Sequence, residues 1–311
     1  MGIGIGIGIG ISPGVSGGGP EINEPLTNAT FQQAVNDILA QDPNGDYDLV
    51  PYGKIQDWDV SQVTTMVNAF RFKSTFNGDI SSWDTSSVTN MKGMFNGASD
   101  FNQPLNNWNV SNVTLMNQMF HSTNLFNQDL SSWNTSSVTN MSYMFRNGFA
   151  FNKDISAWNV SSVTNMRQMF DNANAFNQTL NTWDVSNVTS MNEVFKNNII
   201  FNQPLNNWDT SSAITMSGMF QDATAFDQNL SSWNITSLNL TITLNNFLFN
   251  GTLSTSNYDA LLIGWSAQTP LLNGLAPNFG NSQYTLGGAA ESARNTLINT
   301  YGWTITDGGG I

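Results

Sequence analysis

The stretch FNGDISSWDTSSVTNMKGMFNGASD, from Phe76 to Asp100, recurs along the chain with a period of 25 residues. A methionine series and two phenylalanine series, which include Met66, Phe70 and Phe76, keep the same step as the tryptophans. The eight tryptophans are Trp58, Trp83, Trp108, Trp133, Trp158, Trp183, Trp208 and Trp233. A fixed period of this length is the signature of a solenoid, a propeller or an array of repeats.

The local pattern within one unit predicts one strand and one helix. ISSWDTSSV carries β-branched and aromatic residues among small polar ones, which favours a short strand or extended arm. Met91, Met94 and Phe95 are spaced as on one face of a helix. No single unit can bury these side chains alone, but stacked units can. The sequence therefore predicts an α/β solenoid with about eight coils of 25 residues, each with a short strand and a short helix.

The repeat divides the chain into four segments. Residues 1–20 form a segment rich in Gly and Ile, residues 21–50 an N-terminal cap, residues 51–250 the solenoid and residues 251–311 a C-terminal cap. Terminal repeats of a solenoid need an atypical cover. The sequence supplies candidate helical covers at both ends.

The caps have recognisable helix signals. Residues 30–41 have an apolar face and begin at Thr30, which can accept a hydrogen bond from a free amide of the first turn. Residues 257–266 and 289–302 predict two more helices, the second ending at Gly302, and WTIT predicts a last strand. After Trp233 the pattern decays, and the next methionine position is expected at Thr241.

Two polar series recur with the repeat. Asn follows Phe from Asn77 to Asn202 and Asp227 closes the series, while Asp or Asn follows each tryptophan of the repeat. Buried turns leave backbone groups that must be paired. We therefore interpret these residues as a structural ladder that bridges successive coils. A row of ligand contacts is the alternative.

The first residues, MGIGIGIGIGIS, alternate Gly and Ile, so that in a strand every Ile lies on one face. Such a strand also has a free edge that can pair with another chain. We therefore expect Ile3, Ile5, Ile7, Ile9 and Ile11 to anchor the protein to a protein partner or to other copies of itself. The alternative is an unanchored tail.

Composition excludes several functions. The formal net charge is −13 with nine Lys and Arg, which are scattered along the sequence, so nucleic acid and anionic membranes are poor partners. The absence of cysteine excludes disulfides and thiolate metal sites. No apolar run reaches the length of a membrane span, and the uncharged start does not resemble a secretory signal.

The sequence offers little for catalysis. His121, the only histidine, occupies a position that varies between units, so we expect it to face solvent and to be inert. The carboxylates do not line up between units as they would in a polysaccharide-processing solenoid, and no enzyme is expected. Asp42, Asp46 and Asp48 in DPNGDYD are weak candidates for calcium, but a plain turn explains this segment better. No other cofactor is expected.

A ligand surface should use the positions that vary between coils. The candidates are Lys92, Gln118, Tyr143, Arg167 and Glu193, together with the loops near His121, Arg146 and Lys196. A cell-surface glycan or a protein receptor is the expected type of ligand.

The pattern FNxxISSWDTSSVTNMxxMF resembles the BspA-like surface repeats, which are related to leucine-rich repeats and occur in bacterial lipoproteins, adhesins and some viral proteins. The resemblance covers residues 51–250 and implies a solenoid like that of leucine-rich repeats and a surface role, without catalytic residues. Two functions follow as hypotheses. The first is a component of a virion surface, such as a phage head or tail fibre, that serves host attachment. The alternative is an extracellular bacterial adhesin on the cell surface.

Overall fold

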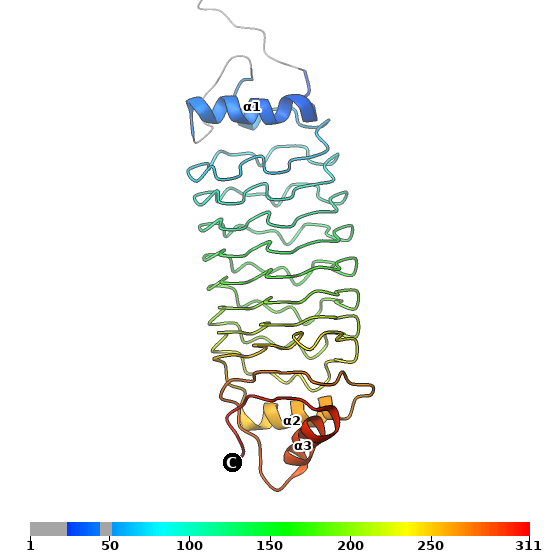
Figure 1. Cartoon of the computed structure of the whole chain (residues 1–311). Helices are drawn as coiled ribbons and strands as arrows, with labels where there is room; N and C mark the ends of the chain where they lie inside the picture. Colours follow the sequence, from blue (N-terminus) through cyan, green and yellow to red (C-terminus); the bar gives the residue numbers. More distant parts are fainter. Residues whose placement is uncertain (1–23, 44–51) are drawn as a thin grey trace, which may run out of the picture.

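The computed structural model describes residues 24–43 and 52–311. Figure 1 shows a stack of coils with helix α1 (Asn28–Gln41) across one end and helices α2 (Thr255–Ser266) and α3 (Ala289–Tyr301) across the other. A short 3-10 helix, η1 (Ile55–Asp57), leads into the first coil. The apolar core runs through the whole stack.

The expectation of a strand in each coil is wrong. Val88 N–H donates to the Thr85 carbonyl (2.9 Å) and Ser86 N–H to the Asp84 carboxylate (3.0 Å). These local turns use the donors that a ladder would need. Each coil up to Thr215 contributes one isolated parallel bridge, such as that at Asn90, and the described residues contain no strand. WTIT likewise forms only an isolated bridge.

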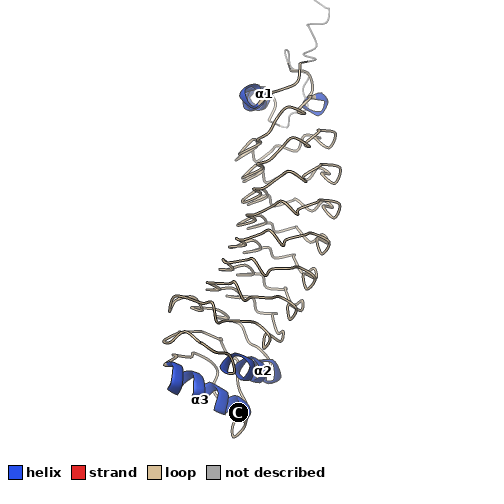
Figure 2. Ribbon diagram, turned by 90° about the vertical axis from the view of Figure 1, so that its right-hand side faces the viewer, coloured by secondary structure: helices blue, strands red, loops and turns tan. Residues whose placement is uncertain are grey.

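The expected helix in each coil is wrong too. Met91 and Gly93 donate from N–H to the carbonyls of Leu115 and Asn117 in the next coil (both 2.9 Å), whereas Met94 donates back to Met91 (3.2 Å). The φ angle of Gly93 is +61°. A helix would direct every donor to the residue four positions earlier, with negative φ throughout. The coils are therefore chains of β-turns and form neither an α/β nor a leucine-rich-repeat solenoid, as Figure 2 shows.

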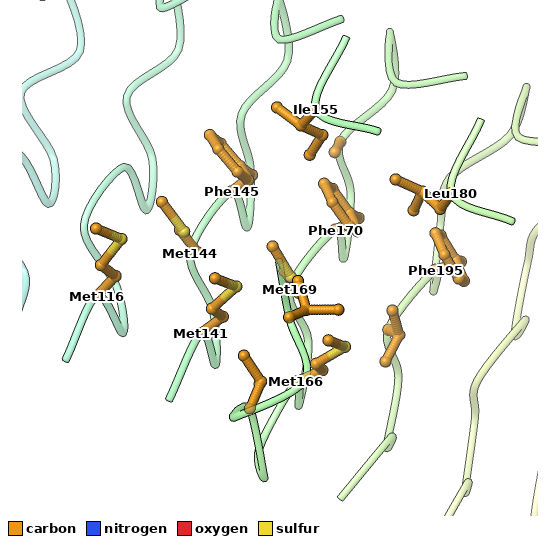
Figure 3. Close-up of a cluster of buried hydrophobic side chains, with 14 of the residues drawn as sticks. Met116, Met141, Met144, Phe145, Ile155, Met166, Met169, Phe170, Leu180 and Phe195 are labelled. Atoms are coloured by element: carbon orange, nitrogen blue, oxygen red, sulfur yellow. The ribbon is translucent and has the colours of Figure 1, made fainter. Parts of the chain in front are cut away.

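The core is built of aromatic stacks that run from coil to coil. Phe95 lies 5.6 Å from Phe120 and 4.0 Å from Phe101, with the rings nearly parallel in both pairs. Trp158 stacks on Trp183 at 6.5 Å. Methionines and aliphatic residues fill the space beside these stacks, and Figure 3 shows them pointing inward from successive coils. The residues that recur in the sequence are thus the ones that the stack buries.

Side-chain hydrogen bonds tie the coils together. The Asn77 side chain accepts from Asn102 N–H (2.9 Å), and the same bond repeats along the series up to Asp227 N–H on Asn202 (2.9 Å). This confirms the predicted asparagine ladder. For the Asp or Asn after each tryptophan the prediction of a ladder is wrong, because the side-chain oxygen accepts from the N–H two residues ahead in the same coil, as Asn159 does from Ser161 (3.0 Å).

The three helices cover the ends of the stack. Helix α1 begins at Asn28 with Thr27 as its N-cap, so the expected cap at Thr30 is wrong by three residues. Helix α3 ends at Tyr301 with Gly302 as its C-cap, where φ is +66°, which confirms the predicted stop at this glycine. Arg294 of α3 and Tyr258 of α2 both bind Asp307 (2.8 Å each), which joins the two helices to the end of the chain.

Candidate functional site

The variable residues gather on one surface, which we call the turn face. It consists of the turn segments that start at each recurring methionine. These segments are residues 66–73, 91–98, 116–123, 141–148, 166–173, 191–198 and 216–223. In each of them the first, fourth and fifth residues are buried in the core. The second, third, sixth and seventh residues are mostly partly exposed, so they are less constrained by the core and vary more between coils.

The turn face has the opposite charge to the rest of the protein. It carries six of the nine Lys and Arg residues, namely Arg71, Lys73, Lys92, Arg146, Arg167 and Lys196. It holds only three carboxylates, those of Asp171, Glu193 and Asp222, which gives it a formal charge of +3 in a chain of −13. An anionic ligand would therefore be attracted to this surface rather than to any other.

Two of the cations on the turn face are paired. Arg146 binds Asp171 (2.9 Å), whose side chain is 4% exposed, and Lys196 binds Glu193 (2.9 Å). Burial raises the pKa of Asp171 above its ordinary value, although Arg146 opposes the shift. The Glu193 carboxylate also accepts from the Gln168 amide, so both of its oxygens are engaged.

Arg167 differs from these two. It is exposed, and its guanidinium lies 5.9 Å from the centre of the Tyr143 ring. In the part of the chain that the structure describes, it has no carboxylate partner. Its guanidinium is thus available to a ligand.

A groove of about 390 Å³ crosses the turn face beside Arg167. Arg167, Asn192, Glu193 and Ser217 lie on its polar side. Its apolar side is formed by Ile214, Leu240 and Ile242, whose side chains are 39%, 60% and 60% exposed.

The groove exists because one coil is longer than the others. Met191 N–H donates to Thr215, 24 residues ahead, but Met216 N–H donates to Thr243, 27 residues ahead. The three extra residues lie in the segment 239–242, and Asn239, Leu240 and Ile242 of this segment line the groove. The buried methionine position of this coil is consequently occupied by Leu244, and the expectation of Thr241 is wrong.

The five predicted ligand residues do not form a single site. Arg167 and Glu193 line the groove. Tyr143 is not a lining residue, but its ring lies 5.9 Å from the Arg167 guanidinium. Lys92 occupies the repeat position of Arg167 three coils earlier, and Gln118 occupies that of Gln168 two coils earlier. Both lie away from the groove and do not line it.

His121 is half-buried rather than facing solvent. Its Nδ1 atom is buried without a hydrogen-bond partner, because neighbouring coils cover the ring. Burial, reinforced by Arg146 and Arg71, lowers the pKa of the imidazole. The ring is therefore neutral near pH 7, and no acceptor orients it as a catalytic base would require.

The weak calcium candidates are only partly described. Asp42 is buried at the end of α1, where its N–H caps the helix by donating to the Ile38 carbonyl (2.8 Å). Asp46 and Asp48 lie outside the described residues, as do the predicted anchoring residues Ile3 to Ile11. Within residues 24–43 and 52–311, no cluster of His, Asp or Glu has the arrangement of a metal site. No helix in these ranges is long and apolar enough to cross a bilayer.

Sequence reasoning missed both the charged surface and the groove. The cations are scattered in sequence, but they fall at a few positions of the 25-residue period. Numbering each cation within its unit would have revealed the surface. The groove needs the path of residues 239–242, which the broken pattern alone does not supply.

Comparison with known proteins places the repeat in a family. The family described as "Mycoplasma protein of unknown function, DUF285" matches residues 48–158 and again residues 139–257. No curated protein and no solved structure matches the chain. The two family matches together cover more than half of the 311 residues. The chain therefore belongs to this DUF285 family.

Proposed function

We propose that the protein is a non-enzymatic display scaffold whose turn face binds a receptor on another molecule. One observation supports this most directly. The recurring residues are occupied by the core and the asparagine ladder, whereas the varying residues and most of the cations share one exposed surface. A surface that varies on a constant scaffold is typical of recognition rather than of catalysis.

The first setting that we propose is a virion surface, such as a phage head or tail fibre used for host attachment. The tract from Ile3 to Ile11 supports it, because alternating Gly and Ile suit pairing with a strand of a larger assembly. The second setting is a bacterial cell surface, where the protein would act as an adhesin. Membership of a Mycoplasma family and the resemblance to BspA-like repeats favour the second.

Arrays of glycans and peptides test the proposed recognition. The whole chain should bind members of the array, and the triple variant Lys92→Ser, Tyr143→Ser, Arg167→Gln should bind them less. The matched control is Asp129→Asn with Asp154→Asn, which alters exposed residues away from the turn face. Equal binding by all three proteins would contradict the role of the turn face.

Deletion of residues 2–11 tests the anchoring. In a virion, the shortened protein should fold normally but should be lost from purified particles. Unchanged incorporation would contradict anchoring through the Gly-Ile tract, and it would leave the turn face untouched.

A further inference from the structure

We propose that the groove beside Arg167 binds a peptide through a carboxylate and an adjacent aliphatic side chain. The inference rests on the proposed display function and specifies the ligand of one part of the turn face. Three features of the groove support it, namely a free cation, an aliphatic wall and an unpaired backbone carbonyl.

The free cation is Arg167. In contrast, Arg146 and Arg294 form ion pairs with carboxylates at 2.9 and 2.8 Å. Arg167 has only the weak contact with the Tyr143 ring, and the nearby Glu193 is neutralised by Lys196. A guanidinium presents paired donors that match a carboxylate. The positive charge of Arg167 is therefore left without a negative partner among the polar residues of the groove.

The aliphatic wall arises from a change in the repeat. Ile214 stands where the six preceding coils have an exposed threonine. Leu240 and Ile242, both 60% exposed, project from the extra residues beside it. Three exposed aliphatic side chains in one groove are costly in water and favour contact with an apolar group.

The third feature, an unpaired backbone carbonyl, lies beside the aliphatic wall. From Thr89 to Thr189, each exposed threonine donates from N–H and from Oγ1 to the threonine carbonyl one coil earlier, as Thr189 does to Thr164 (2.9 and 3.1 Å). Ile214 still donates to Thr189 (2.9 Å), but Asn239 does not continue the series. Among the described residues none donates a hydrogen bond to the Ile214 carbonyl, and the series of parallel bridges between successive coils ends at Thr215.

These features together favour a peptide. An extended peptide supplies an N–H for the Ile214 carbonyl, an aliphatic side chain for the wall and a carboxylate for Arg167. A sugar ring would instead favour an aromatic platform, and the residues lining the groove include none. We assign the carboxylate to the peptide C-terminus, where the last residue carries the charge and the aliphatic side chain together.

Methyl NMR of the full chain, labelled at isoleucine, tests the proposal with N-acetyl-leucine as the probe. The methyl signals of Ile214 and Ile242 should shift in a saturable manner, with a Kd of about 1–10 mM for so small a ligand. Signals of Ile263 and Ile311, which are exposed elsewhere, should not move. N-acetyl-leucine amide, which lacks the charge, and glucuronate, which lacks the aliphatic group, should each bind at least about five-fold more weakly.

Two variants and one control complete the test. Arg167→Gln should weaken binding of N-acetyl-leucine at least about five-fold through loss of the charge-assisted hydrogen bonds, and Leu240→Ser should also weaken it through loss of apolar contact. Lys92→Gln, the matched cation three coils away, should leave binding unchanged, and the buried Ile155 signal should confirm folding in every variant.

Equal binding of the acid and its amide, or unchanged binding by Arg167→Gln, would overturn the proposal. Equal shifts with glucuronate would overturn it in favour of an acidic glycan. If the arrays show binding that depends on the turn face while this groove stays empty, the display function stands and the groove assignment fails.

Discussion

Trp58 and Trp158 occupy the same place in their coils, but only Trp158 has a hydrogen-bond partner. Its indole N–H donates to the buried Leu130 carbonyl (3.0 Å), and the N–H of Trp83 likewise donates to the Ile55 carbonyl (2.8 Å). Within residues 24–43 and 52–311, the N–H of Trp58, in the first coil, is buried with no partner. The tryptophan of the first coil therefore lacks the indole hydrogen bond that Trp83 and Trp158 form.

We predict that Trp158→Phe and Trp83→Phe each lower the free energy of unfolding by about 1–3 kcal/mol more than Trp58→Phe does, because they strand a buried carbonyl. Chemical denaturation of the three variants measures the difference. Trp83 distinguishes the effect of the hydrogen bond from the effect of position in the stack, because it forms the bond but lies only one coil from Trp58. If Trp83→Phe lowers the free energy of unfolding no more than Trp58→Phe does, the hydrogen-bond explanation is contradicted.

Acid sensitivity also has a residue-level cause. Asp84, Asp129, Asp154 and Asp184 each accept hydrogen bonds from the serine two residues ahead, and these bonds lower the pKa of each carboxyl. A lowered folded-state pKa gives stability that is present above the unfolded-state pKa, about 3.9, and is lost as pH falls through the folded-state pKa. Asparagine fills the same positions in other coils and forms the same bond without a charge.

We predict that replacing these four aspartates with asparagine moves the midpoint of acid unfolding to lower pH. At pH 7 the Tm should be unchanged or slightly higher, because the chain loses negative charge. Circular dichroism during an acid titration measures the midpoint. Replacing the exposed Asp100, which accepts no such bond, is the control. An unshifted midpoint in the fourfold variant would show that these turns do not set acid stability.

At the scale of elements, the C-terminal cap depends on one buried carboxylate. Asp307, 3% exposed, receives two bonds from Arg294 (2.8 and 3.2 Å) and one from the Tyr258 hydroxyl (2.8 Å). Burial and the Asp307 charge raise the pKa of Tyr258, so its hydroxyl stays protonated and remains a donor.

We predict that Asp307→Ala destabilises the cap by about 3–5 kcal/mol, since it leaves Arg294 without its charge partner. Amide hydrogen exchange should accelerate in α2 and α3 but not in the central coils. Glu291→Gln is the control in the same cap, because its side chain is partly exposed and an amide oxygen can still accept from Gly287 N–H (2.8 Å in the parent). Equal exchange in the Asp307 variant would contradict the prediction.

At the scale of the whole molecule, each coil contacts mainly its two neighbours. Deletion of residues 126–150 removes one complete period and places Phe151 where Phe126 was. We predict that this variant folds, with a lower denaturant m-value because less surface is buried. Near-ultraviolet circular dichroism and urea unfolding measure both properties.

Deletion of residues 126–137 is the control. It removes about half a period and breaks the register of every stack, so it should prevent cooperative folding. A folded product from this shorter deletion, or an unfolded one from the full-period deletion, would show that the register of the coils does not govern folding.

The sequence by itself determined the period, the buried residues and the helices at both ends, because burial of apolar side chains depends on residue type and spacing. Only the tertiary structure decided the path of the backbone. Its amides bond partly to local turns and partly to the next coil, a competition that side-chain pattern does not encode. Likewise the turn face and its groove exist because stacking aligns cations that are far apart in sequence, and because three extra residues near Leu240 interrupt that alignment.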